Sequence, residues 1–151
     1  TSKWVGGVLA PNGKIYGIPY KSTTVLEIDP INRTTSTFGS LSGSNKWMGG
    51  VLAPNGKIYG IPFESKAVLE IDPVNRTTST FGSLRTESGT WVGGVLALNG
   101  KIYSIPAKSD SVLEMDFGFP AATGAAGSED WALSGLPGNV LDPRSAYFNK
   151  L

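Results

Sequence analysis

The chain has 151 residues, a formal net charge of +1 and 40% hydrophobic residues, so it is long enough to bury a core of its own. It contains no Cys and no His, which excludes disulfides and thiolate chemistry and removes the commonest general base and transition-metal ligand. The near-neutral charge argues against nucleic acid as a partner, and no apolar run approaches the roughly 20 residues of a membrane-inserted helix.

One stretch occurs three times along the chain. It reads WVGGVLAPNGKIYGIPY at 4–20, WMGGVLAPNGKIYGIPF at 47–63 and WVGGVLALNGKIYSIPA at 91–107. The repeats start 43 and 44 residues apart, and residues 1–41 match residues 44–84 at 33 of 41 positions. We therefore interpret the chain as an array of three similar units.

The first unit predicts four short strands, over residues 4–10, 14–20, 24–29 and 34–38. Asp29-Pro30 opens a turn between the third and fourth strands, because Pro restricts φ and Asp bonds to local backbone. The fourth run, TTSTF, is rich in β-branched residues and more polar, so we expect it at the outer edge.

The sequence Asn12-Gly13 predicts a two-residue type I′ hairpin turn between the first two strands. That turn would pair Ala10 with Ile15, Leu9 with Tyr16, and Gly7 with Ile18. Both faces of the resulting hairpin are apolar, whereas a sheet with one solvated face alternates apolar and polar residues. We therefore expect the hairpin to be covered on both sides.

The third unit departs from the others after Asp116. Residues 117–130, FGFPAATGAAGSED, predict an irregular loop, and 131–136, WALSGL, could supply the fourth strand. The units then span about 1–43, 44–87 and 88–136, followed by a C-terminal tail at 137–151. We expect this tail to dock, because it carries the aromatic pair Tyr147-Phe148.

A four-stranded unit with this period is typical of a β-propeller blade. We predict an all-β fold of three four-stranded antiparallel blades, with the glycine pairs near the crowded propeller axis. An open β-solenoid and a β-sandwich are the alternatives, and the near-identical repeats disfavour the sandwich.

The Gly pair, the NGKIY hairpin and the VLEIDP strand and turn resemble a kelch-type repeat over most of residues 1–136. The resemblance implies a propeller of six or seven blades that serves as an interaction platform. Three blades do not close a ring, so each end blade would expose an apolar face. We expect a protein partner or a homo-oligomer to complete it, most simply a dimer with six blades, although the chain could also be a fragment of a longer protein.

The candidate interaction residues are aromatic, and they recur once per blade. They are Trp4, Trp47, Trp91, Tyr16, Tyr59 and Tyr103, together with Tyr147 and Phe148 of the tail. The Trp residues could fill the space between blades, and a ring of Tyr, Lys and Trp could stack on carbohydrate or peptide. The Asn-Arg-Thr triplets at 32–34 and 75–77 are possible glycosylation sites.

Two carboxylates lie two residues apart in every repeat, as in Glu27 and Asp29. Such a pair could bind Ca²⁺ or act in acid–base catalysis. We favour a structural interpretation, in which Asp bonds its own turn and Glu is solvated or pairs with Lys. An enzyme site is a convergent, asymmetric cluster, whereas these pairs recur at equivalent positions.

The sequence thus predicts a non-catalytic structural or protein-interaction module, with no catalytic, metal-binding or cofactor-binding residue. The alternative is a lectin-like propeller that binds carbohydrate at one site per blade. The second turn, which differs among the repeats at 21–23, 64–66 and 108–110, disfavours a repeated pocket.

Overall fold

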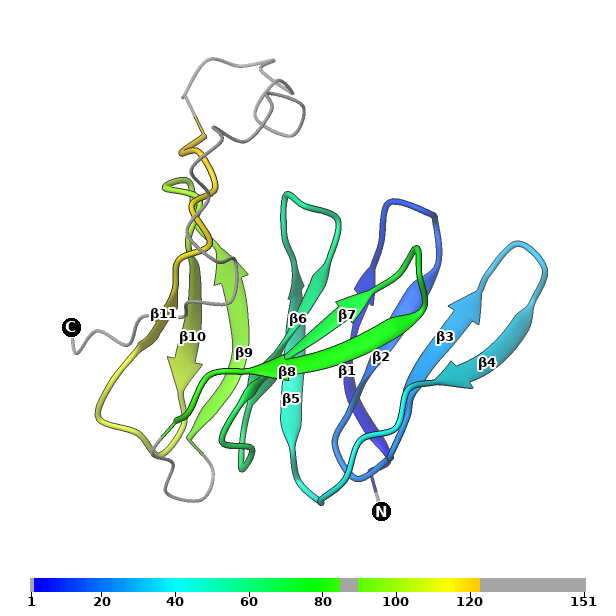
Figure 1. The fold of residues 1–151 in the computed structure, drawn as a ribbon, viewed down its shortest axis with the longest axis horizontal. Helices are drawn as coiled ribbons and strands as arrows, with labels where there is room; N and C mark the ends of the chain where they lie inside the picture. The colour runs from blue at the N-terminus through cyan, green and yellow to red at the C-terminus, as the bar shows by residue number, and fades with distance from the viewer. Residues whose placement is uncertain (1, 85–89, 123–151) are drawn as a thin grey trace.

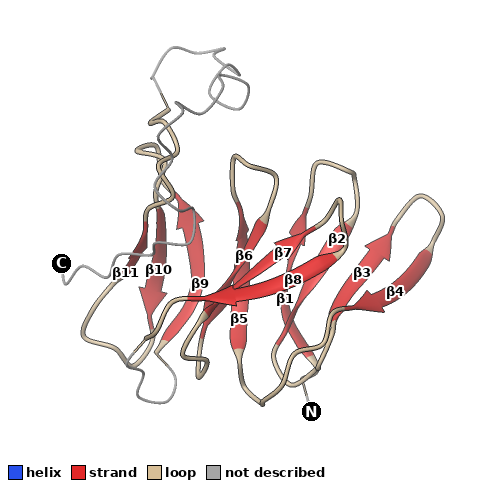
Figure 2. Cartoon of the chain, in the orientation of Figure 1, coloured by secondary structure: helices blue, strands red, loops and turns tan. Residues whose placement is uncertain are grey.

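The structure is a computed structural model that describes residues 2–84 and 90–122. Within these ranges it consists of strands, turns and loops, and no helix there could span a membrane (Figure 2). The strands are β1 (Trp4–Leu9), β2 (Ile15–Pro19), β3 (Val25–Asp29), β4 (Thr34–Phe38), β5 (Trp47–Leu52), β6 (Ile58–Pro62), β7 (Val68–Asp72), β8 (Thr77–Phe81), β9 (Trp91–Leu96), β10 (Ile102–Pro106) and β11 (Leu113–Met115).

These strands form three antiparallel sheets that stand side by side (Figure 1). Blade one has the order β1-β2-β3-β4, blade two β5-β6-β7-β8, and blade three β9-β10-β11. The all-β fold of antiparallel blades is confirmed, with four strands in blades one and two and three in the described part of blade three. The strand expected at 131–136 and the tail at 137–151, with Tyr147 and Phe148, lie outside the described residues.

The predicted hairpin register is wrong by one residue. The observed pairs are Leu9 with Ile15, Val8 with Tyr16, and Gly7 with Gly17. The Ala10 N–H donates to the Lys14 carbonyl at 2.9 Å, and the Gly13 N–H donates to the Ala10 carbonyl at 3.0 Å.

The turn chemistry explains this shift. A type I′ turn needs positive φ at both Asn12 and Gly13, but only Gly13 has it, at 78°. Pro11 suits the first central position of a type I turn, so the loop contains three residues, with Gly13 in the left-handed region. Tyr16 consequently shares a face with Val8 instead of Leu9, although both faces of the hairpin remain apolar.

The innermost strands of the blades, β1, β5 and β9, lie next to one another (Figure 1). A Cβ added to Gly6 would lie only 2.9 Å from the Gly49 Cα, and one added to Gly49 would lie 3.0 Å from the Gly93 Cα. Gly6 also has a φ of 84° at an irregularity in the β1 pairing, a conformation that disfavours larger residues. This close approach agrees with the expectation that glycine pairs lie where the blades converge.

The core consists of two layers, one in each junction between blades. Between blades one and two lie Ala10, Tyr16, Ile18, Val25, Leu41, Trp47, Ile58, Leu69 and Ile71. Between blades two and three lie Val51, Ala53, Tyr59, Ile61, Val68, Phe81, Leu84, Trp91, Ile102, Leu113, Met115, Phe117 and Phe119. Both faces of blade two are therefore buried, whereas the described residues cover blades one and three on one face each.

The start of the predicted loop 117–130 has no regular secondary structure as far as residue 122, as expected. Its two phenylalanines are nevertheless core residues, which the sequence did not predict. Phe117 stacks on Tyr59 of blade two with ring centroids 4.3 Å apart, and Phe119 packs beside Phe117. This segment therefore closes the second junction.

Candidate functional site

Each blade carries a polar cluster beside its apolar layer, and strand register brings its members together. In blade one, Tyr16 on β2 pairs with Glu27 on β3, and Glu27 pairs with Ser36 on β4. Cross-strand partners share a face of the sheet, so these three side chains form a row. Lys14 precedes β2, and Asn12 lies in the hairpin turn.

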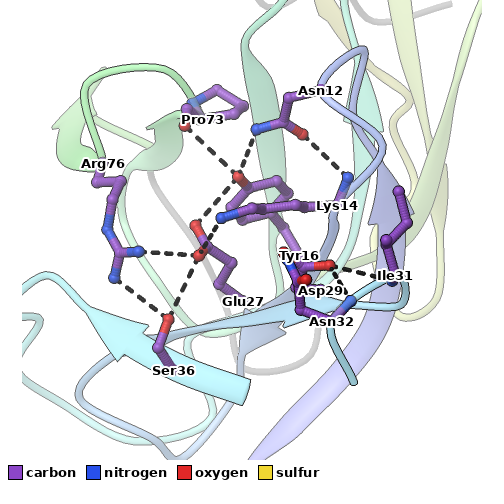
Figure 3. Close-up of polar contacts among 10 residues, drawn as sticks. All are labelled: Asn12, Lys14, Tyr16, Glu27, Asp29, Ile31, Asn32, Ser36, Pro73 and Arg76. Carbon is purple, nitrogen blue, oxygen red and sulfur yellow. Dashed lines mark hydrogen bonds and ion pairs between the residues drawn. The ribbon is translucent and has the colours of Figure 1, made fainter. Parts of the chain in front are cut away.

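The Glu27 carboxylate is the centre of this cluster (Figure 3). It accepts a bond from the Lys14 ammonium at 2.9 Å and another from the Tyr16 hydroxyl at 3.2 Å. The Asn12 amide donates to the Tyr16 hydroxyl oxygen at 2.9 Å. The side chain of Glu27 is only 5% exposed, so these partners compensate a buried charge.

Blade two adds a cation to the cluster of blade one. The Arg76 guanidinium, from the turn between β7 and β8, lies 2.8 Å from Glu27 Oε1 and donates to Ser36 Oγ at 3.3 Å (Figure 3). It also lies over the Phe38 ring, 5.2 Å from the centroid. In the sequence, the Asn-Arg-Thr triplet indicates only a possible glycosylation site, so this link between blades is not predicted from it.

The electrostatics of the cluster follow from these contacts. Burial raises the pKa of Glu27, but the hydrogen bond from Lys14 and the charges of Arg76 and Lys14 outweigh burial and lower that pKa overall. The hydrogen bond with Glu27 raises the pKa of Lys14. Burial raises the pKa of Tyr16, so the phenol stays protonated at neutral pH.

Blades two and three repeat the same arrangement. Lys57 lies 2.7 Å from Glu70, and Lys101 lies 2.9 Å from Glu114. Asn55 and Asn99 donate to their blade's Tyr hydroxyl, as Asn12 does. In blade three, Lys101 also approaches Asp116 at 3.4 Å.

The second carboxylate of each pair has a different role. Asp29 Oδ1 accepts the N–H groups of Ile31 and Asn32, at 3.0 and 2.9 Å. The backbone and side-chain bonds from Asn32 lower the pKa of Asp29. Asp72 makes the same turn in blade two. The carboxylates thus have the structural partners predicted for them, and the polar clusters serve to connect strands and blades.

The recurring Trp and Tyr residues meet across the junctions. Trp47 of blade two shares a core layer with Tyr16 of blade one, and Trp91 of blade three shares one with Tyr59 of blade two. Each indole N–H donates at 2.8 Å to a backbone carbonyl of its own blade. Trp4 is only partly buried, and Tyr103 lies on the outer face of blade three. These two residues therefore belong to neither of the two junctions between blades.

A polar hollow of about 500 Å³ lies beside the segment that joins blades one and two. Its lining includes Ser42, Trp47, Glu64 and Lys66. Lys46 at its edge is buried, and its ammonium donates to three backbone carbonyls, including that of Ser22 at 2.8 Å. Burial lowers the pKa of Lys46. This lysine therefore holds the linker in place.

No protein-family model and no curated protein matches the sequence. Among solved structures, the chain is similar to virginiamycin B lyase from Staphylococcus aureus, with a TM-score of 0.63 and 10% identity over 76% of this chain and 38% of the lyase. It is also similar to a streptogramin B lyase, with a TM-score of 0.62 and 17% identity over 76% of this chain and 37% of the lyase.

A third similar structure is an auxiliary nutrient binding protein from Bacteroides ovatus, with a TM-score of 0.60 and 16% identity over 76% of this chain and 28% of that protein. The chain thus spans well under half the length of these structures. Identities this low show the fold and leave activity open. The sheets, their order and these neighbours identify the described residues as an open, incomplete β-propeller.

Proposed function

We propose that this chain is a non-catalytic propeller segment whose two outer blade faces bind further blades, so that it acts as a structural or interaction subunit. One observation carries the proposal. The open face of blade one has the residues Trp4, Leu9, Ile15, Leu26 and Ile28, which correspond to the face of blade two that is covered by blade one: Trp47, Leu52, Ile58, Leu69 and Ile71.

Exposure distinguishes the two faces. Ile58, Leu69 and Ile71 are fully buried, whereas their blade-one counterparts are each partly exposed. A contiguous apolar face of this kind is typical of an interaction surface. The kelch-type resemblance of the repeat agrees with a role as an interaction platform.

The polar clusters support a non-catalytic role. Every repeat has a carboxylate, an amine and a phenol at equivalent positions. In blade one these are Glu27, Lys14 and Tyr16, and the amine and the phenol both donate to the carboxylate. Within residues 2–84 and 90–122, no group of three or more acidic side chains has the arrangement of a metal site. Two of the similar structures are lyases, but that activity belongs to those proteins.

The test measures particle mass by light scattering and exposed apolar surface by the fluorescence of the dye ANS. We expect either an assembly heavier than the 15.9 kDa chain or a monomer that binds ANS. Leu9→Asp should reduce whichever signal occurs. Ile31→Asp is the matched control, because Ile31 is 86% exposed and its counterpart Val74 stays 84% exposed beside a formed junction. A monomer that binds no ANS, or equal effects of the two variants, would refute the proposal.

The second candidate is a lectin-like function, and the polar hollow beside Trp47 favours it. Hydroxyl-bearing and charged side chains around an indole edge are suited to a carbohydrate. However, Glu64 and Lys66 in the lining correspond to Lys21 and Thr23 in blade one, so the hollow is not a repeated site. A glycan array with the wild-type chain and Lys66→Ala tests this: binding that the substitution abolishes would support the lectin.

A further inference from the structure

We propose that the open face of blade one binds blade three of a second copy of this chain, in a head-to-tail contact. This inference rests on the proposed function, in which the outer faces are contact surfaces, and names the partner. Three features of the structure carry it: the residues on the two open faces, their exposure, and an arginine at the edge of blade one.

The internal junction between blades one and two shows what covers each kind of face. One side presents Val8, Ala10, Tyr16, Ile18 and Val25 of blade one. The other side is the Trp47 face of blade two. The next junction repeats this pattern, with Val51, Ala53, Tyr59, Ile61 and Val68 packed against the Trp91 face of blade three.

The outer face of blade three has the same residues as the Tyr-bearing side of both junctions. They are Val95, Ala97, Tyr103, Ile105 and Val112. Ile105 is 52% exposed and Val95 is 59% exposed, whereas Ile18 and Ile61 are fully buried. Blade one presents the matching Trp4 face, on which Leu9 is 61% exposed. The two open faces are thus the two halves of one junction.

The edge of blade one carries an arginine at the position of the one that crosses the first internal junction. At the first internal junction, Arg76 of the following blade binds Glu27 of the preceding blade at 2.8 Å. Arg33 is the counterpart of Arg76 in blade one, and the two residues have nearly the same φ, 56° and 55°. Asp29 accepts hydrogen bonds in the turn that contains Arg33, as Asp72 does in the turn that contains Arg76. Among the described residues, the Arg33 guanidinium makes no hydrogen bond or ion pair.

Glu114 of blade three is the counterpart of Glu27. It is buried and lies 2.9 Å from Lys101, as Glu27 lies 2.9 Å from Lys14. Placed on blade three of a second copy, blade one would bring Arg33 to the edge that carries the Lys101–Glu114 pair, as Arg76 lies beside the Lys14–Glu27 pair. The apolar faces and this charge pair favour the same orientation.

A head-to-tail contact joins different surfaces, so it closes only if the rotation returns to the starting face. Two copies supply six blades and form the junction twice. Both junctions then use blade three of one copy and blade one of the other. A symmetric pairing of two blade-one faces would leave Arg33 opposite Arg33, with no carboxylate of the Glu27 type.

Complementation between two variants tests this arrangement. Leu9→Asp places a charge on the blade-one face, and Ile105→Asp places one on the blade-three face. Both side chains are more than half exposed in the single chain, so the substitutions should leave the fold intact, as circular dichroism can verify. Particle mass is measured by light scattering for the wild type, each variant, their equimolar mixture and the Ile31→Asp control.

We expect the wild type and Ile31→Asp to form particles of about twice the 15.9 kDa chain mass. Each face variant alone should be monomeric, because both junctions of a homodimer would contain a charge in an apolar contact. The mixture should recover a heterodimer held by one intact junction. Arg33→Glu should raise the dissociation constant of the wild-type dimer by about tenfold or more.

Two results would overturn the inference, and they differ from failure of the proposed function. If the wild type is a monomer that binds ANS, the faces are contact surfaces for another protein and the second copy is wrong. If only Leu9→Asp dissociates the particle, blade one pairs with itself and the head-to-tail contact is wrong. A monomer that binds no ANS refutes both proposals.

Discussion

Gly50→Ala should destabilise the chain because Gly50 faces the preceding blade at very short range. A Cβ there would lie 2.7 Å from Ile18 Cδ1, 3.1 Å from Ile18 Cγ1 and 3.2 Å from the Tyr59 carbonyl oxygen. Ile18 is fully buried, so it cannot move into solvent. Overpacking of this kind costs about 1–3 kcal/mol. For a chain of this size, the midpoint of thermal unfolding should fall by roughly 3–10 °C.

Gly7→Ala is the matched control, at the same position in blade one. The nearest atom to its added Cβ is Ile15 Cγ2 at 3.4 Å, an ordinary contact. No blade in the described part of the chain covers this side, and Ala reduces the conformational entropy of the unfolded state. We expect the free energy of unfolding to be unchanged or to rise by about 0.4–1 kcal/mol.

Both variants are best measured by urea and thermal unfolding in the Ile105→Asp background, which keeps the end faces uncovered. If Gly50→Ala were as stable as Gly7→Ala, the packing of β5 against blade one would be refuted. In the wild-type chain, Gly7→Ala also tests the proposed head-to-tail dimer. Ile105 of the second copy should then occupy the place of Ile18, so the variant should weaken the dimer while the single chain keeps its stability.

Three further predictions concern the junctions. Arg76→Ala should lower the free energy of unfolding by about 1 kcal/mol, because it removes a cross-blade ion pair, whereas Arg33→Ala in the Ile105→Asp background should stay within about 0.5 kcal/mol on urea titration. The folded-state pKa of Glu27 lies below its ordinary value of 4.5, so ionised Glu27 stabilises the fold above pH 4.5, and this stabilisation is lost as the pH falls through the folded-state pKa. Glu27→Gln should therefore flatten this part of an acid-unfolding curve, and an unchanged curve would contradict the assignment. In single-tryptophan variants of the Ile105→Asp background, acrylamide should quench Trp4 more strongly than Trp47, which is 3% exposed; equal quenching would mean that the blade-one face is covered.

The repeat alone indicated much of the architecture. Four β-rich runs per unit predicted the strands, and apolar residues on both sides of each hairpin predicted blades packed face to face. These features depend on local preferences and on a period of two along a strand, which can be read from neighbouring residues. The partners of Asp29 were predictable for the same reason, since they lie within three residues of it.

The register of the hairpin was not predictable from Asn12-Gly13 alone. Asn-Gly is compatible both with a two-residue type I′ loop and with a three-residue loop built on a type I turn. The two loops shift the pairing of the flanking strands by one residue. Pro11 favours the type I turn, but Leu98 replaces it in the third repeat and that loop has the same bonds, from Ala97 to Lys101 and from Gly100 to Ala97. Pro11 is therefore not required for this register.

Contacts between blades were decided only in the tertiary structure. Arg76 lies 49 residues from Glu27, and Phe117 reaches Tyr59 across a junction, so no local pattern links the members of either pair. The sequence by itself determined three blades with two apolar faces each, because composition and strand period are local properties. Which faces are covered, and that Arg76 crosses the first junction to Glu27, depends on how the blades are placed in space.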